Sequence, residues 1–177
     1  MMRRGVSAVI ATVLLVLLTL TAVGVIAAFI IPFVKNSLDD GTACLTYRDY
    51  YQFEEEFKMN CRQGSLHGAS VRAAGSEGLA EEVSGLRLTF SEEGSAKTVK
   101  VDAGAAVKLG ELTMLDPAAG TFSIPGSGEV RTYVHTSSEA YTKVKVFPVL
   151  KTGKVCDVTD EITLKLCVGV DLANPGA

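Results

Sequence analysis

The chain has 177 residues, of which 47% are hydrophobic and 21% charged, and its formal net charge is −3. A charge this mild argues against a nucleic-acid partner, because binding to phosphates depends on clustered Lys and Arg side chains. Beyond an apolar N-terminal segment, the length that remains suits one globular domain with its own core.

The N-terminal segment at residues 6–34 contains 29 residues and no Asp, Glu, Lys, Arg or His. An α-helix rises about 1.5 Å per residue, and a bilayer core takes about 20 apolar residues. The segment therefore predicts a helix that can span a membrane. We assign this hydrophobic helix to residues 6–40, after a leader at 1–5 and before a head at 41–177.

Three fates are open to such an N-terminus. A secretory signal peptidase could cut at the small residues Ala22-Val23-Gly24, which would leave the apolar run VIAAFIIPFV at the new N-terminus. A permanent signal anchor would keep the helix and everything before it. A short cleavage ahead of the helix would remove the leader alone and leave the apolar segment on the mature protein.

The junction ahead of the apolar segment favours the third fate. Arg3-Arg4-Gly5 followed by VSAVIAT resembles the class III signal of archaeal type IV pilins, and the resemblance covers residues 3–34. It implies that a prepilin peptidase cleaves between Gly5 and Val6, while Arg3 and Arg4 hold the leader at the anionic face of the membrane. Glycine suits such a site because it lets a protease approach the backbone closely.

The resemblance implies a structural subunit of an extracellular archaeal type IV pilus-like filament that serves surface adhesion. The helix would lie in the cytoplasmic membrane before assembly and in the filament core afterwards, with the head outside the cell. The implied partners are further copies of the chain, the membrane, the prepilin peptidase and the pilus assembly platform. Ile10 stands where bacterial type IV pilins carry a glutamate, so packing rather than an ion pair must set the subunit register.

Small residues along the apolar segment are candidates for helix–helix packing. Lipid and protein are both apolar, so assembly gains little from the hydrophobic effect and depends on close approach of the helices. The candidates are Ala8, Thr12, Thr19, Ala22, Gly24 and Ala28. The alternative is that Ala and Thr are merely tolerated in a membrane helix.

Pro32 lies late in the apolar segment and removes one helical hydrogen bond. We expect a kink at this proline, or an end of the helix near Ile30. Lys35 could then cap the helix, and the sequence DDG at 39–41 predicts the turn into the head.

Four cysteines, Cys44, Cys61, Cys156 and Cys167, all lie beyond the apolar segment. The even number predicts two disulfides, which persist in oxidising compartments, and the arginine pair near the N-terminus favours a cytoplasmic start. Both arguments put the head outside the cell. The three possible pairings cannot be separated from sequence. We favour Cys44–Cys61 together with Cys156–Cys167, and the alternative is four unpaired thiols.

The segment between the first two cysteines concentrates aromatic and charged residues. Its aromatic side chains are Tyr47, Tyr50, Tyr51, Phe53 and Phe57. We expect them to form local core rather than an adhesive outer patch, although aromatic residues with polar tips also favour interfaces. Residues 62–85 are rich in Gly, Ser and Ala and are expected to form a loop.

From Leu86 onward, apolar and polar residues alternate in short runs separated by Gly and Pro. The alternation predicts a hairpin over 86–101 and inward faces on two later strands. These faces consist of Val144, Val146, Pro148 and Leu150, then of Ile162, Leu164, Leu166 and Val168, with Cys167 outward. Pro148 indicates a sheet edge or a bulge. The expected fold class is α+β, a long helix followed by an antiparallel β-sandwich-like head.

The sequence contains no recognisable motif for catalysis, cofactor binding or metal binding. Ser76 and Ser127 lack the pattern of a nucleophile elbow, and His67 and His135 stand far from the paired cysteines of a zinc site. We expect both histidines at surface or hydrogen-bonded positions. We expect neither an enzyme, nor a cofactor, nor a metal site.

A second function from a different class remains open on this sequence. It is a signal-anchored extracellular β-sandwich protein, a binding or surface-layer-associated module that does not polymerise. Such a protein would retain Arg3 and Arg4 and would remain a monomer in detergent.

Overall fold

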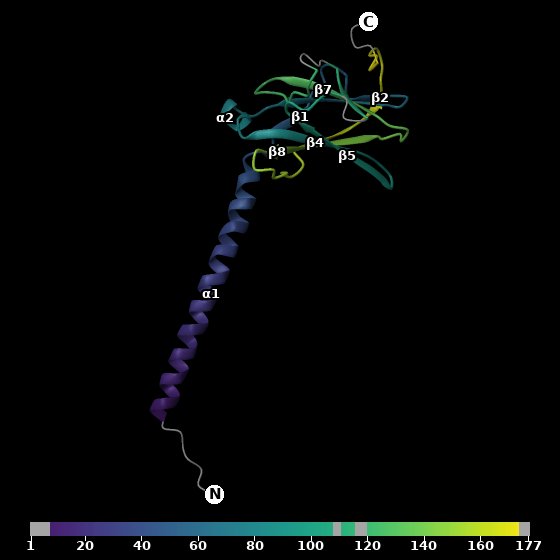
Figure 1. Ribbon diagram of the computed structural model, residues 1–177. Helices are drawn as coiled ribbons and strands as arrows, with labels where there is room; N and C mark the ends of the chain where they lie inside the picture. Colours follow the sequence, from purple (N-terminus) through teal and green to yellow (C-terminus); the bar gives the residue numbers. More distant parts are fainter. Residues whose placement is uncertain (1–7, 108–110, 116–119, 174–177) are drawn as a thin grey trace. The chain divides into compact units, whose positions relative to one another are not determined.

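The computed structural model describes residues 8–107, 111–115 and 120–173 and, for residues 8, 9 and 36–41, the backbone alone (Figure 1). The chain divides into two compact units, Met1–Ala43 and Cys44–Ala177. This boundary lies three residues after the one expected from composition. The first unit is helical, and the second contains the strands, so the fold class is α+β.

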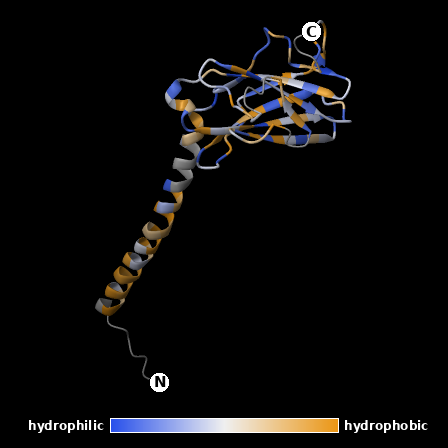
Figure 2. Ribbon diagram, turned by 45° about the horizontal axis from the view of Figure 1, so that its top comes forward, coloured by the Kyte–Doolittle hydropathy of each residue, from blue (hydrophilic) through white to orange (hydrophobic). Residues whose placement is uncertain are grey.

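Helix α1 runs from Ala8 to Leu45 without interruption, and the hydropathy colouring along it is mostly apolar (Figure 2). Pro32 lies inside the helix, so the expected end near Ile30 is wrong, as are a cap at Lys35 and a turn at 39–41. A proline removes one backbone hydrogen bond and adds some steric strain. A long helix can continue through a proline when the helical turns before and after it keep their own hydrogen bonds. A bend at Pro32 stays a prediction.

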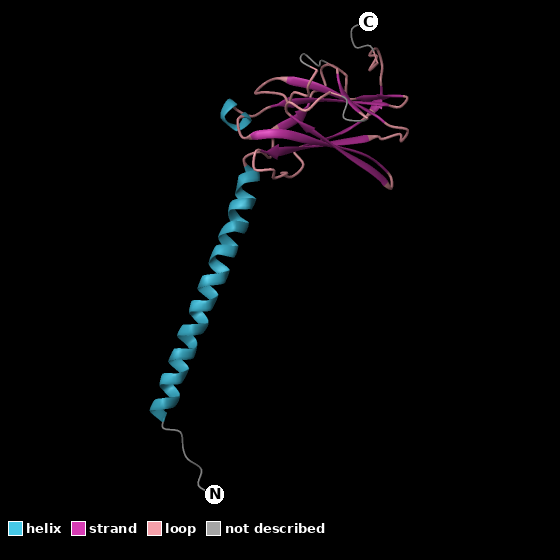
Figure 3. Ribbon diagram, in the orientation of Figure 1, coloured by secondary structure: helices cyan, strands magenta, loops and turns pink. Residues whose placement is uncertain are grey.

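In the described residues of the second unit, ten strands form two sheets. Figure 3 shows these strands in magenta. The first sheet has the order β10-β2-β3-β7-β6, with β1 also paired to β3; its strands are β1 (Tyr51–Phe53), β2 (Cys61–Gln63), β3 (Leu66–Ala73), β6 (Leu112–Met114), β7 (Val130–Thr136) and β10 (Lys165–Leu166). The second has the order β5-β4-β8-β9; its strands are β4 (Val83–Glu92), β5 (Ser95–Asp102), β8 (Lys143–Leu150) and β9 (Asp160–Thr163). A short helix, α2 (Glu77–Ala80), precedes β4. The pairing is antiparallel except between β10 and β2.

The second sheet follows the alternation in the sequence. Leu88 pairs with Val146 and Phe90 with Val144, and all four side chains are fully buried. The hairpin between β4 and β5 closes tightly, with Gly94 at φ 80°, a conformation that glycine adopts without a steric penalty. The predicted hairpin and the inward face of β8 are therefore confirmed.

Strand β3 corrects the expectation of a loop over residues 62–85. It lies between β7 on one side and β1 and β2 on the other. Its small residues allow close packing: a Cβ on Gly68 would clash with the carbonyl oxygen of Met59 and lie 2.9 Å from Leu172 Cδ2. The small, weakly hydrophobic residues of β3 therefore reflect close packing around the strand rather than exposure to solvent.

One main core cluster draws side chains from both sheets, including Val71 and Tyr133 from the first and Leu88 and Val146 from the second. The aromatic residues of the segment after α1 join it. Tyr47, Tyr50, Tyr51 and Phe53 are buried, while Phe57 is 52% exposed. The expectation of local core is confirmed for these four residues and wrong for Phe57.

The C-terminal strand pattern is wrong beyond Leu164. The chain leaves the second sheet after β9 and joins the first sheet as β10, which pairs with β2 in parallel. Leu164 is buried at this crossing, whereas Leu166 and Val168 are 66% and 80% exposed. Alternation of apolar and polar residues predicts which face of a sheet a side chain occupies only while the chain stays in one sheet.

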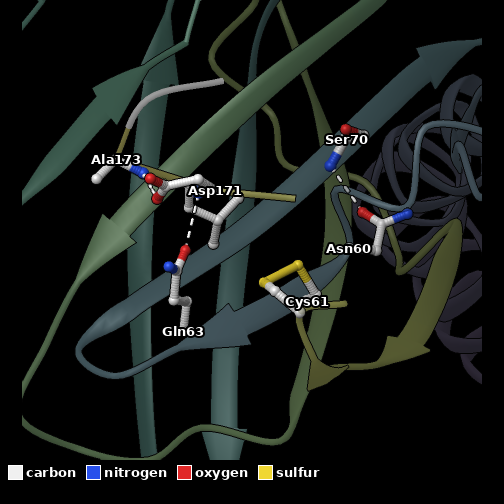
Figure 4. The surroundings of a disulfide bond; sticks show 8 residues. Asn60, Cys61, Gln63, Ser70, Asp171 and Ala173 are labelled. Carbon is white, nitrogen blue, oxygen red and sulfur yellow. Dashed lines mark hydrogen bonds between the residues drawn. A yellow bond between two sulfur atoms is a disulfide. The ribbon is translucent and has the colours of Figure 1, made fainter. Parts of the chain in front are cut away.

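The four cysteines form two disulfides, Cys44–Cys156 and Cys61–Cys167. The favoured pairing, Cys44–Cys61 with Cys156–Cys167, is therefore wrong. The parallel pairing of β10 with β2 explains the second bond, since the Cys167 N–H donates to the carbonyl of Arg62 and the sulfurs meet beside it (Figure 4). This contact is long-range, and no local spacing indicates it.

Candidate functional site

The apolar part of α1 is the first candidate site. Its span Ile10–Lys35 has 26 residues, and an 18-residue stretch of it has a mean hydropathy of 2.9 and is not buried within the chain. By length and composition it can cross a membrane, as an anchor or a signal segment does. Large side chains are exposed on it all round, for instance Leu18 at 70% and Phe29 at 72%.

Exposure of this extent requires a covering. Leaving one large apolar side chain in water rather than burying it costs about 1.5 to 3 kcal/mol. The helix carries such side chains along its whole described length from Ile10 to Val34. A span of this composition therefore calls for an apolar surrounding, which a bilayer supplies to an anchor or a signal segment.

The candidate packing residues of the span fall on two sides of the helix, and further small residues, Ala11, Thr21 and Ala27, fall beside and between them. At about 100° per residue, Thr12, Thr19 and Ala22 fall within an arc of about 80°, and Gly24 and Ala28 fall roughly opposite. The two sides thus offer close approach in opposite directions. A Cβ on Gly24 would meet nothing within 4 Å, so the surface at this glycine is open to a neighbour.

Polar groups on the span are satisfied within the helix. The Thr19 hydroxyl donates to the carbonyl of Val16 at 2.9 Å, and Thr21 makes the same bond to Leu18. These bonds let threonine lie in an apolar environment. Near Thr12 the surface is hollowed by a shallow groove of about 240 Å³ that Val13, Val16 and Leu17 also line.

The predicted cleavage site cannot be placed. Arg3, Arg4, Gly5 and Val6 lie outside the described residues, as does the side chain of Ala8. Their roles stay predictions.

A pocket of about 470 Å³ in the head is a second candidate site, which the sequence did not indicate. Its walls include Glu55, Lys58, Asn60, Lys165, Leu166 and Val168, and Cys61 lies among them. Asn60 is held firmly, because its amide donates to the Glu54 carbonyl and accepts from the Ser70 N–H, both at 2.7 Å (Figure 4). Lys58 has φ 53°, an uncommon conformation for a residue other than glycine. The pocket thus has a fixed wall, exposed apolar side chains and charges of both signs.

The two histidines form a third feature. His67 on β3 and His135 on β7 are direct cross-strand partners, and both are fully buried. Their rings lie among those of Phe90 and Tyr141, with the His135–Phe90 centroids 4.9 Å apart and the His67–Tyr141 centroids 5.4 Å apart. The expectation of surface positions is wrong. His135 is hydrogen-bonded, since its Nδ1 lies 3.2 Å from the Glu111 carbonyl oxygen.

Burial lowers the pKa of both histidines below the ordinary value, because a charged imidazolium is poorly solvated in the core. In the part of the chain that the structure describes, no three His, Cys, Asp or Glu side chains converge as metal ligands. His67 lies in a run rich in Gly and Ser, which gives no sequence signal of burial, and the strand order was needed to find its pairing with His135.

Comparison of the chain with protein-family models and with curated proteins finds no match in either.

Proposed function

We propose that this chain is a structural subunit of an extracellular filament of the archaeal type IV pilus kind, used in surface adhesion. A prepilin peptidase removes residues 1–5, the helix moves from the cytoplasmic membrane into the filament core, and the head faces outward. The observation that carries the proposal is α1, whose apolar span is exposed on every side directly after the RRG–VSAVIAT junction.

The arrangement of small residues supports polymerisation over a simple anchor. A filament grows when one surface of a subunit binds a different surface of the next, so each core helix needs at least two contact faces. The faces around Thr19 and Gly24 lie on opposite sides of α1, as the helical repeat requires. A helix that served only as an anchor would tolerate small residues but would need no such contact faces.

The head supports an extracellular location. Two disulfides are typical of proteins in oxidising compartments. We also propose that its two sheets form a sandwich. The ring contact between His67 of β3 and Phe90 of β4, with centroids 6.2 Å apart, and the core cluster shared by both sheets support this arrangement.

Processing gives the direct test. Intact-mass measurement of the protein from its native membrane should show a chain that begins at Val6. A Gly5→Val variant should keep the full leader, because a β-branched residue blocks close approach of the protease, and a matched Gly24→Val variant should be processed normally. The opposite pattern, with cleavage lost in Gly24→Val alone, would identify a secretory signal and exclude pilin processing.

The head pocket favours a second candidate function, a signal-anchored binding or surface-layer-associated protein that does not polymerise. Its exposed Leu166 and Val168 beside Lys58 and Lys165 suit a bound partner. This candidate requires an intact leader with Arg3 and Arg4 and a monomer in detergent, so the same mass measurement separates the two.

A further inference from the structure

We propose that His67 and His135 form an acid-sensitive lock that holds the two sheets of the head together at one end and releases them when the surrounding pH falls. The inference concerns the head alone and does not rest on the proposed filament.

The lock joins strands of both sheets. His67 and His135 belong to β3 and β7 of the first sheet, and Phe90 belongs to β4 of the second. Tyr141 stands just before β8, and its ring lies 6.0 Å from that of His135 in a stacked arrangement. His67, His135 and Phe90 are fully buried, and Tyr141 is 4% exposed. The four rings therefore close the core between the sheets at this end.

The lock holds only while both imidazoles are neutral. In the described structure, neither ring nitrogen of His67 meets a partner in hydrogen-bond geometry, and neither does Nε2 of His135. A proton on either ring would thus bring a charge into the core that nearby carbonyl groups and the Glu111 carboxylate compensate only in part, because burial remains the largest influence on the pKa of both rings. The two ring centroids lie 6.2 Å apart, so a second proton would add repulsion to burial.

Burial is the largest cause of the lowered pKa of both histidines, and the groups around the pair act on these pKa values in both directions. Arg62 on β2 acts on His67, and Lys97 on β5 acts on His135, and both positive charges oppose protonation. Glu111, which precedes β6, favours protonation of His135 through its carboxylate and its backbone carbonyl. The same carboxylate forms an ion pair with Lys97, with the Lys97 nitrogen 3.5 Å from a Glu111 carboxylate oxygen. The backbone of Ser65 and of His135 itself also raises the pKa of His67, and burial, the largest cause, still lowers it.

The lowered pKa values of the two histidines determine how the stability of the head changes with pH. Unfolded histidine takes up a proton near pH 6.5, whereas the buried ring resists until a lower pH. Stability is therefore complete above about pH 6.5 and falls as the pH drops toward the folded pKa values. In that window each histidine reduces the folding equilibrium constant by up to about tenfold per pH unit, and the pair by up to about a hundredfold.

The two sheets of the head can loosen at this end without coming apart. The Cys61–Cys167 bond joins β2 to the segment after β10, and Cys44–Cys156 joins two further segments of the head. Both bonds survive acid, so the strands stay tethered while the ring cluster opens. We expect the change to reverse on return to neutral pH.

The test uses the full chain in detergent and measures the pKa of each histidine through hydrogen–deuterium exchange at its ring C2 position. Both values should lie below 6.5. The protection factors of the β3 and β7 backbone amides, corrected for the intrinsic pH dependence of amide exchange, should then fall at pH 4.5 relative to pH 7.5, while those of α1 stay unchanged. A pKa at or above 6.5 for both residues would overturn the proposal, and this measurement needs no variant.

Matched variants isolate the contribution of the pair. Urea unfolding of the head is measured between pH 7.5 and 4.5 for the native chain, for Tyr141→Phe and for the double variant His67→Leu/His135→Gln. Tyr141→Phe keeps the rings and both histidines and should retain the native pH dependence. The double variant should lose the steep part of it. An equally steep loss in all three would overturn the proposal, and if the double variant does not fold, the C2 exchange values decide.

Discussion

Cys44 is bonded to Cys156, 112 positions later in the chain, with their Cα atoms 5.2 Å apart. The second bond, Cys61–Cys167, closes a loop almost as long, with a separation of 106. The two loops overlap, so both bonds restrict the same stretch of the unfolded chain. Long closed loops restrict the unfolded state most in the chain-entropy account of disulfide stabilisation.

Removal of one disulfide should therefore destabilise the head strongly. For Cys61→Ala/Cys167→Ala we expect a loss of about 2 to 5 kcal/mol in the free energy of unfolding, measured in urea without reductant. The double variant Cys44→Ala/Cys156→Ala should lose a similar amount. Because the loops overlap, each bond shortens the loop that the other closes in the unfolded chain, so the loss on removing both bonds should be larger than the sum of the two single losses.

Peptide mapping without reduction provides the control for the pairing. Linked peptides should contain Cys44 with Cys156 and Cys61 with Cys167. Any linked peptide that joins Cys44 to Cys61 would contradict the structure.

Gly68 tests whether β3 is crowded as described. Gly68→Ala would place a methyl group against the Met59 carbonyl and 2.9 Å from Leu172 Cδ2, so we expect a loss of about 1 to 3 kcal/mol in unfolding free energy. Gly78→Ala in α2 is the matched control, since its Cβ would meet nothing within 4 Å. That variant should be neutral or gain a few tenths of a kcal/mol. Equal stability of the two would argue against close packing at β3.

Asn60 should stabilise the wall of the head pocket through both ends of its amide. Asn60→Ala leaves the Ser70 N–H without its acceptor, which we expect to cost about 1 to 3 kcal/mol. Asn60→Asp keeps the acceptor oxygen and loses the donor to Glu54, so its effect in the same urea titration should be smaller. An aspartate variant less stable than the alanine variant would contradict this assignment of roles.

The sequence pattern correctly predicted the strands that remain in a single sheet and bury one face of it. Val144 and Val146 alternate with lysines on β8, and their burial follows from period two alone. The apolar helix is equally plain, because no charge interrupts residues 6–34. The predicted end of the helix was wrong. Pro32 and the sequence DDG at 39–41 both indicate a helix end, yet the helix continues through both to Leu45.

Features that depend on long-range pairing could not be predicted. Strand β3 looks like a loop because Gly68, Ala69 and Ser70 carry little hydrophobic signal. The absence of a side chain at Gly68 is what lets Met59 and Leu172 pack against this strand. The disulfide partners and the buried histidine pair follow from the order of strands in the first sheet. No local pattern encodes that order.

Gly24 tests the packing surface of α1. Gly24→Leu should leave insertion into the membrane intact, because it adds apolar surface, and should reduce filament yield strongly, because it fills the space at an open contact face. Val23→Leu is the matched control, since this neighbouring residue is already large and 64% exposed. Membrane fractionation and filament recovery measure the two effects separately. Equal filament yield from both variants would count against close packing at Gly24.

The most direct measurement is electron microscopy of filaments sheared from the native cell surface, with peptide mapping of the purified material. The account predicts filaments that contain this chain, with an N-terminal peptide that starts at Val6 and both disulfides intact. Recovery of the chain only as a membrane-bound monomer that still carries Arg3 and Arg4 would contradict it.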